Sequence, residues 1–183
     1  MNEKKIALSL NILELFAICI ILTTTLYLQF FENELPCPLC ILQRFGFLTV
    51  AFALMLNLIY GPKPSHYGLA IFGSLLTTVF ATRQILLHIV PGTGEYGSPL
   101  FSLHLYTWTL LICIGSLLYI ALMLMLDKQF ILSRMDLNSR KFSLLIKMIC
   151  YFLIFLCLIN GISTFLECGM GPCPDNPVSY QFL

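Results

Sequence analysis

Five long apolar runs constrain this sequence most, because each is about as long as a bilayer is thick. A helix that crosses a membrane needs about 20 predominantly apolar residues, and in lipid its backbone must satisfy its own hydrogen bonds. We expect spans at about residues 6–30, 41–60, 67–90, 104–126 and 142–166, followed by a tail at 167–183. The sequence therefore predicts an all-α membrane protein: one integral membrane domain over residues 1–183, with a four-helix transmembrane bundle and a fifth transmembrane helix.

Composition supports a protein surrounded by lipid. Only 10% of the residues are charged and 58% are hydrophobic, whereas a soluble domain carries about 25% charged residues. The net charge of +1 gives no reason to expect a nucleic-acid partner. The first run is too long for the apolar region of a signal peptide, and no small-residue cleavage site follows it, so we expect an uncleaved span.

Basic residues gather in alternate connecting segments, which predicts the orientation in the membrane. These residues are Lys4, Lys5, Lys63, Lys128, Arg134, Arg140 and Lys141, with Lys147 just inside the fifth run. The remaining segments hold acidic residues instead, namely Glu32, Glu34, Glu95, Glu167 and Asp175. Because short cytoplasmic loops are enriched in Lys and Arg, we expect a cytoplasmic N-terminus and, after five spans, a C-terminal tail on the outer side.

The eight cysteines divide into two groups under this topology. Four fall at the outer edges of spans, where an oxidising compartment favours disulfide chemistry: Cys37, Cys40, Cys168 and Cys173. The other four lie within apolar runs, where we expect them to pack as small hydrophobic residues: Cys19, Cys113, Cys150 and Cys157.

Cys37 and Cys40 form a Cys-x-x-Cys motif where the second run begins. Arg44 follows Cys40 by four residues, so on a helix the two share a face. A guanidinium group and a helix N-terminus both favour the thiolate form of a cysteine, which indicates a reactive dithiol. A structural disulfide and a zinc site are alternatives. A disulfide between Cys37 and Cys40 would close so short a loop that it would constrain little of the unfolded chain. A zinc site would need four ligands, and the adjacent Arg44 would repel the cation, so we expect no metal.

The second pair, Cys168 and Cys173, encloses a Gly- and Pro-bearing segment that permits a short disulfide ring. It is expected on the same side of the membrane as Cys37 and Cys40. It is therefore either a structural disulfide or a relay that exchanges electrons with the first pair.

Arg83 and His88 lie near the outer end of the third run. Charged residues within spans usually mark a functional site. The alternative is that a long side chain extends so that its charged end reaches the membrane–water interface. The sequence has no motif for haem, an iron–sulfur cluster or a nucleotide, which leaves a quinone as the electron carrier. We expect it against spans two, three and four near Cys40, with Arg44 stabilising negative charge and His88 donating a proton or hydrogen bond.

The block Cys37-Pro38-Leu39-Cys40-Ile41-Leu42-Gln43-Arg44, placed just after the first span, resembles the DsbB family of disulfide bond formation proteins. With the short basic turn and the Arg83 and His88 end of the third run, the resemblance covers roughly Ile6 to Leu126. It implies a four-helix core in a bacterial inner membrane and a bound ubiquinone or menaquinone. It also implies a periplasmic thioredoxin-fold partner of the DsbA type, and places Cys40 and Arg44 next to the quinone.

The chain departs from the family pattern in its second cysteine pair. Family members typically carry that pair in a long loop between spans three and four, whereas residues 91–103 here form a short segment without cysteine. Cys168 and Cys173, after the fifth span, are on the correct side to substitute. We therefore expect a disulfide oxidoreductase in which the tail pair accepts electrons from the partner, passes them to Cys37 and Cys40, and Cys40 delivers them to quinone. Two alternatives remain: a thiol reductase with the reverse electron flow, and a membrane assembly or binding protein with static disulfides.

Overall fold

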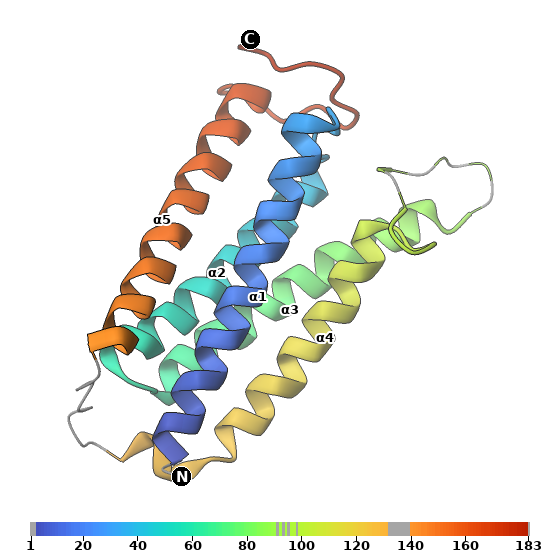
Figure 1. The fold of residues 1–183 in the computed structure, drawn as a ribbon. Coiled ribbons are helices and arrows are strands. Elements are labelled where there is room, and N and C mark those ends of the chain that lie inside the picture. Colours follow the sequence, from blue (N-terminus) through green and yellow to red (C-terminus); the bar gives the residue numbers. More distant parts are fainter. Residues whose placement is uncertain are drawn as a thin grey trace.

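The structure is a computed structural model that describes residues 3–90, 92, 94, 96–97, 99–131 and 140–182. Its helices, shown in Figure 1, are α1 (Glu3–Phe31), α2 (Pro38–Tyr60), α3 (Pro64–His88), α4 (Leu105–Leu124), the short 3-10 helix η1 (Asp127–Phe130) and α5 (Arg140–Cys168). The predicted membrane orientation depends in part on charged residues whose side chains lie outside the described part of the chain: Lys4, Lys5, Glu95, Arg134, Arg140 and Lys141.

All five α-helices are long and apolar enough to cross a membrane, which confirms the expected all-α membrane class. Their bounds differ from the expected spans by a few residues. The largest consequence is at α2, which begins at Pro38 rather than at residue 41, so Cys40 belongs to the helix and not to the preceding loop. Proline fits the first turn of a helix because it has no N–H to satisfy there.

The helices pack with α2 near the centre, in contact with α1, α3 and α5, while α4 packs on α3 (Figure 1). The most extensive helix contact is between α2 and α3, where Gly46 and Gly73 lie at the interface. A Cβ added to Gly46 would overlap Oγ1 of Thr77, and one added to Gly73 would lie 3.1 Å from the carbonyl oxygen of Gly46. Small residues of this kind let two membrane helices approach closely.

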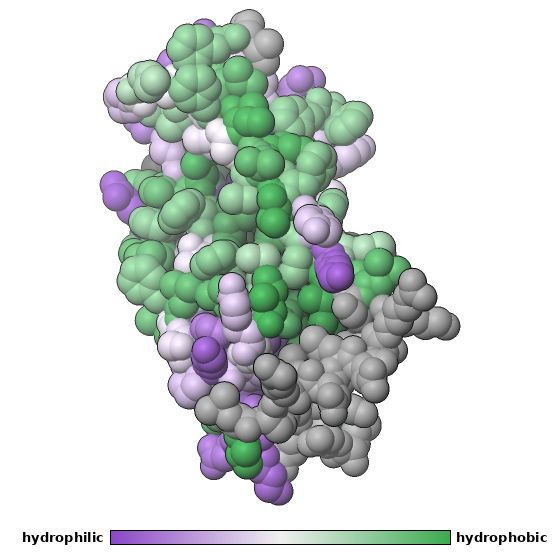
Figure 2. All heavy atoms as spheres, turned by 90° about the vertical axis from the view of Figure 1, so that its left-hand side faces the viewer, coloured by the Kyte–Doolittle hydropathy of each residue, from purple (hydrophilic) through white to green (hydrophobic). Residues whose placement is uncertain are grey.

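Apolar side chains are exposed along the outer faces of the helices. Leu118 on α4 is 64% exposed and Tyr151 on α5 is 71% exposed, and Figure 2 shows apolar side chains over most of the described part of one such face. A soluble monomer rarely exposes apolar surface on this scale. Lipid contact accounts for it, as expected for a multi-pass membrane protein.

A buried polar network closes the end of the bundle that holds the α2–α3 turn. Asn57 Oδ1 accepts a hydrogen bond from the backbone N–H of Lys63 (3.2 Å), and Asn11 Nδ2 donates to the hydroxyl of Tyr67 (2.8 Å). The amide of Asn57 also donates to Asn11 Oδ1 at 3.2 Å, and the Tyr67 hydroxyl donates to Gln129 at 3.0 Å. This network joins α1, α2, α3 and η1 at the end opposite the Cys-x-x-Cys motif.

Candidate active site

The Cys-x-x-Cys motif forms the beginning of α2. Cys37 is the N-cap residue, with φ −68° and ψ 162°, and its Sγ accepts a hydrogen bond from the backbone N–H of Cys40 at 3.1 Å. Pro38 occupies the first turn, where its fixed φ suits the helix. The motif therefore places one sulfur at the cap and the other in the first turn, where the helix dipole favours negative charge.

Gln84 of α3 contacts both sulfurs. Its Nε2 lies 3.3 Å from Sγ of Cys37 and 3.4 Å from Sγ of Cys40. Gln43 Nε2 donates to Gln84 Oε1 at 2.7 Å, which orients the amide so that its N–H groups point at the thiols. Gln84 is 1% exposed, so these hydrogen bonds form out of contact with solvent.

Arg44 lies one turn after Cys40 on α2, as expected. Its guanidinium is held by α1: Nη1 donates to Gln29 Oε1 at 2.5 Å and Nη2 donates to the carbonyl oxygen of Thr25 at 3.1 Å. Gln29 Nε2 donates in turn to the hydroxyl of Tyr180 at 3.2 Å, which connects Arg44 to the C-terminal tail.

Cys37 and Cys40 are free thiols in different surroundings. The hydrogen bond between the Cys37 and Cys40 side chains, together with burial, raises the pKa of Cys37. The Cys37 sulfur therefore keeps its proton, while Cys40 lines a cavity and Cys37 does not. Of the two sulfurs, Cys40 is the one presented to a bound molecule.

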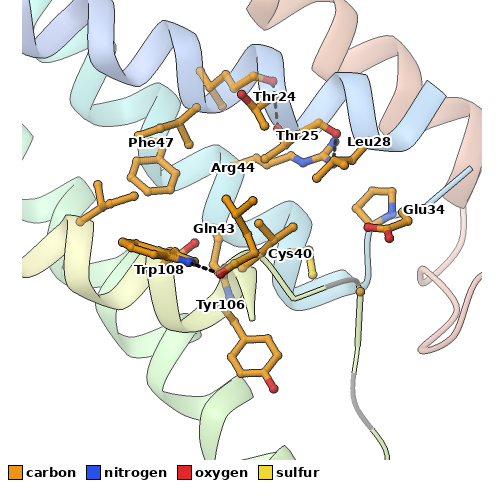
Figure 3. Close-up of a pocket in the computed structure, with 18 of the residues that line it drawn as sticks. Thr24, Thr25, Leu28, Glu34, Cys40, Gln43, Arg44, Phe47, Tyr106 and Trp108 are labelled. Atoms are coloured by element: carbon orange, nitrogen blue, oxygen red, sulfur yellow. Dashed lines mark hydrogen bonds between the residues drawn. The ribbon is translucent and has the colours of Figure 1, made fainter. Parts of the chain in front are cut away.

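The cavity has a volume of about 370 Å³ and lies between α1 and α4, with α2 along its base (Figure 3). Its walls are mainly apolar and include Phe47 and Trp108, whereas Cys40, Gln43 and Arg44 supply polar groups. Its volume and lining suit a small organic ligand, for which sites of about 300–1,000 Å³ are usual. The location differs from the one expected against spans two, three and four, since α1 forms one wall and Gln84 is the residue of α3 in the lining.

The structure does not bring Arg83 and His88 into this cavity. Arg83 is exposed on α3. His88 Nδ1 lies 2.9 Å from the carbonyl oxygen of Gly94, and its ring stacks on Tyr106 with centroids 5.7 Å apart. Tyr106 lines the cavity, so His88 lies behind the wall rather than in it. Among the described residues, no group of three or more His, Cys, Asp or Glu side chains is placed to hold a metal ion.

Cys168 and Cys173 form a disulfide with Cα atoms 4.5 Å apart. The tail folds back on α5, where the backbone N–H groups of Gln181 and Phe182 donate to the carbonyl oxygen of Leu166 at 3.0 and 3.2 Å. The end of α5 and the beginning of α2 lie at the same end of the bundle (Figure 1). Both cysteine pairs are therefore at one end of the bundle (Figure 1).

Sequence reasoning missed the amide side chains that organise the site, Gln29, Gln43 and Gln84. The available signal was that each is a polar residue inside an apolar run, and such residues in spans usually have a partner. Their partners lie on other helices, and the order of residues along one helix does not identify them.

Comparison with known proteins supports the resemblance inferred from the Cys-x-x-Cys motif. The family model "Disulfide bond formation protein DsbB" matches residues 8–96, which include most of α1 and all of α2 and α3. A Disulfide bond formation protein B from Nitrosomonas eutropha is 37% identical over 76 residues, covering 39% of this chain and 47% of that protein. One from Azoarcus sp. is 33% identical over 86 residues, covering 43% of this chain and 51% of that protein. The expected resemblance to the DsbB family is thereby confirmed.

The match has a limited extent. The chain spans about half the length of the curated relatives it matches. The family model ends before α4, so α4, α5 and the tail disulfide lie outside the matched region. No solved structure gives a significant match to this chain.

Proposed function

We propose that this protein is a membrane disulfide oxidoreductase that oxidises a thioredoxin-fold partner of the DsbA type and passes the electrons to a membrane quinone, ubiquinone or menaquinone. The observation that carries the proposal is the position of Cys40. Its sulfur lies in the first turn of α2, lines a mainly apolar cavity and is followed one turn later by Arg44. The names of the matched relatives support disulfide formation as the reaction.

The side chains around the thiols favour negative charge on sulfur, and the thiolate is the form of cysteine that acts as a nucleophile. Gln84 donates hydrogen bonds to both sulfurs, and a donor next to sulfur stabilises negative charge there. The Arg44 guanidinium is fixed by Gln29 and Thr25, so its charge stays at the cavity wall. Forming the S–S bond releases two electrons and two protons.

The cavity residues fit a quinone headgroup. Phe47 and Trp108 offer apolar contact surface, and Arg44 and Gln43 offer hydrogen-bond donors for a carbonyl oxygen. A bound quinone supplies the acceptor for the two electrons and two protons. The apolar walls exclude water from Cys40 and strengthen its interaction with the Arg44 charge.

The tail disulfide is the proposed site of electron uptake. A partner thiolate attacks the Cys168–Cys173 bond and forms a mixed disulfide with one tail cysteine. The second thiol of the partner then attacks this mixed disulfide and releases the tail cysteine as a thiol. The partner leaves oxidised, and the tail pair is left reduced. A tail thiolate then attacks the Cys37–Cys40 disulfide in the same manner. That exchange restores the Cys168–Cys173 bond and leaves Cys37 and Cys40 as thiols, the bonding pattern present in this structure.

The proposed location is the bacterial inner membrane, with a cytoplasmic N-terminus and a periplasmic tail. In that orientation both cysteine pairs lie in an oxidising compartment, which a disulfide-forming protein requires.

The test is quinone reduction by the purified protein in detergent, with a reduced thioredoxin-fold oxidase as electron donor. Wild type should turn over, Cys40→Ser should not, and the Cys168→Ser/Cys173→Ser double variant should lose turnover with the protein partner. Full turnover of the Cys40→Ser variant would contradict the proposal. If the double variant equals wild type, the tail pair is structural and the partner reaches Cys37 and Cys40 directly.

A second measurement distinguishes this function from that of a thiol reductase, in which electrons flow in the reverse direction. Equilibration of the Cys37–Cys40 pair with glutathione redox buffers gives its reduction potential. A disulfide-forming protein needs a pair at least as oxidising as its partner, whereas a more reducing pair would favour the reductase.

A further inference from the structure

Glu34 is a carboxyl group in the lining of the cavity that the proposed chemistry leaves without a role. Part of the lining, here called the loop end, comes from segments between helices: residues 34–36 before α2, and Tyr96, Gly97, Leu100 and Phe101 before α4. Glu34 is partly exposed there, and Figure 3 shows it with Cys40 and Arg44 among the lining residues. Among the described residues of the lining, Glu34 alone carries a carboxyl group.

The local fold holds Glu34 at the loop end from two sides. Its backbone N–H donates to the carbonyl oxygen of Leu28 at 3.1 Å, across a turn in which Asn33 has φ 56°. Asparagine is one of the few residues besides glycine that adopt this left-handed conformation readily. On the other side, a Cβ added to Gly97 would lie 3.7 Å from Oε2 of Glu34. The carboxyl group therefore lies against the α3–α4 segment that forms the rest of the loop end.

The other ionisable side chains of the described lining are those of Cys40, Arg44, Tyr96 and Tyr106. Guanidinium and phenol groups ordinarily keep their protons at neutral pH. Burial further raises the pKa of Tyr96, whose hydroxyl donates to the carbonyl oxygen of Leu35 at 2.5 Å. His88, which the sequence led us to expect as a proton or hydrogen-bond donor, stacks behind Tyr106 and does not line the cavity. Apart from the reacting thiol, Glu34 is left as the lining group suited to proton exchange with solvent.

We propose that Glu34 couples proton uptake to the binding of a quinone, by donating a hydrogen bond from its protonated carboxyl group to a carbonyl oxygen of the quinone. The carbonyl oxygens of a quinone only accept hydrogen bonds, and so do the oxygens of an ionised carboxylate. One proton from solvent therefore forms an O–H bond on Glu34 for each quinone that binds, and no bond of the quinone forms or breaks. This inference rests on the proposed function in taking a quinone as the ligand.

The physical reason is that two acceptors facing each other in an apolar cavity repel. A carboxylate oxygen beside a carbonyl oxygen brings two negative charges together where little water screens them. Binding therefore favours the protonated form of Glu34, and by reciprocity the protonated form favours binding. A quinol hydroxyl donates as well as accepts, so it suits either form, and the proton requirement applies to the oxidised ligand. Glu34 thus holds, beside the ligand, one of the two protons that reduction of a quinone consumes.

The test is quinone binding without turnover, measured by quenching of Trp108 fluorescence. Trp108 is the single tryptophan of the chain and lines the cavity, so a quinone bound there lies close to it. The full-length protein in detergent carries Cys37→Ser and Cys40→Ser, which removes electron transfer and the titration of both thiols. A short-chain ubiquinone is titrated from about pH 5 to about pH 8. Its dissociation constant should rise with pH by up to about tenfold per unit, the limit for one linked proton.

Substitutions at Glu34 in this background separate the charge from the hydrogen bond. Glu34→Gln has an N–H donor at every pH, so it should bind as tightly as the background protein does at low pH, with no pH dependence. Glu34→Ala should also be independent of pH but should bind roughly two- to tenfold more weakly than Glu34→Gln, the contribution of one hydrogen bond. Trp108 emission without quinone should be the same in all variants, which checks that the cavity stays folded.

Glu32→Gln is the matched control. Glu32 is an exposed carboxyl in the same connection between α1 and α2, and it does not line the cavity. This variant should keep the rise of the dissociation constant with pH.

A dissociation constant that does not change with pH in the background protein, or whose rise persists in Glu34→Gln, would overturn the inference. Equal binding by Glu34→Gln and Glu34→Ala would also overturn it, because that pattern shows removal of a charge without a donated hydrogen bond. Either result alongside quinone reduction by the wild type would leave the proposed function standing. Absence of quenching at every pH would contradict a quinone as the ligand, and with it both the inference and the proposed function.

Discussion

Gln84 is the side chain that contacts both thiols, with its Nε2 at 3.3 Å from Cys37 Sγ and 3.4 Å from Cys40 Sγ. Gln84→Leu keeps much of the volume and removes the donor. A hydrogen bond to a charged group contributes about 1.5–3 kcal/mol, so we expect Cys40 alkylation at neutral pH to slow by roughly tenfold or more. Leu86→Ala, two residues along α3 at a position 61% exposed, is the control and should leave the rate unchanged. Equal rates for Gln84→Leu and wild type would show that the amide does not stabilise the thiolate.

Cys37 carries a second residue-scale prediction, because the Cys40 side chain is the largest cause of its raised pKa and burial is the next. A raised pKa keeps Cys37 as a neutral, unreactive thiol up to a higher pH than an ordinary cysteine. Cys40→Ala removes the first cause, so the pKa of Cys37 should fall and its alkylation at pH 8 should become faster, by roughly tenfold for each pKa unit. Peptide-resolved mass spectrometry measures this rate. Buried Cys113 should stay unlabelled in both proteins, and faster labelling of Cys37 and Cys113 together would indicate unfolding instead.

The sequence predicted part of this site at the residue scale. The pair Cys40 and Arg44 followed from one helical turn, a short-range relation that the chain itself specifies. Gln84 did not follow, because its partners lie 41 residues away or more along the chain and depend on how α3 packs against α2. Arg83 and His88 were expected near the cofactor from their depth in the membrane. Neither lines the cavity beside Cys40, since depth does not say which way a side chain points around its helix.

The crossing of α2 and α3 sets the distance between Gln84 and the two thiols, and it depends on Gly46. A Cβ at this position would overlap Oγ1 of Thr77 and lie 3.0 Å from the Thr77 Cβ. We expect Gly46→Ala to lower the stability by about 1–3 kcal/mol, the usual cost of overpacking, despite the better helix propensity of alanine. Thermal unfolding in detergent measures the change.

Gly115 of α4 is the matched control, since a Cβ there meets nothing within 4 Å. Gly115→Ala should therefore be neutral or slightly stabilising. If both alanine variants melt alike, the α2–α3 contact is not tightly packed at Gly46. A lowered melting temperature for Gly46→Ala with unchanged Cys40 alkylation would show that the crossing stabilises the fold without positioning Gln84.

At the scale of elements, the apolar runs predicted five helices and their approximate ends, because length and hydropathy suffice to identify a span. They did not predict which helices enclose the cavity. In a membrane helix both the lipid face and the packed face are apolar, so the periodicity that orients a soluble helix is weak. The α1 wall of the cavity was missed for this reason, and it is recognisable only once Arg44 is seen bonded to Gln29 and Thr25.

At the scale of the whole molecule, both cysteine pairs lie at one end of the bundle (Figure 1). The matched family region, residues 8–96, contributes the Cys-x-x-Cys pair, and α5 outside that region packs on α1 and α2 and carries the other pair to the same end. Tyr180 of the tail bonds Gln29, the residue that also holds Arg44. A fifth helix thus brings a second cysteine pair to this end from the C-terminal side, whereas the α3–α4 connection contains no cysteine.

Five crossings place the chain termini at opposite ends of the bundle (Figure 1), and the proposed function fixes which end faces outward. A fusion of alkaline phosphatase after Phe182 should be active in cells, because that enzyme needs an oxidising compartment for its disulfides. Phosphatase inserted at Ser65, in the α2–α3 turn region at the other end, should be inactive, and green fluorescent protein at Ser65 should fluoresce. The reverse pattern would place Cys37, Cys40 and the tail pair in the cytoplasm, where glutathione keeps thiols reduced, and would exclude disulfide formation in an outer compartment as the physiological reaction.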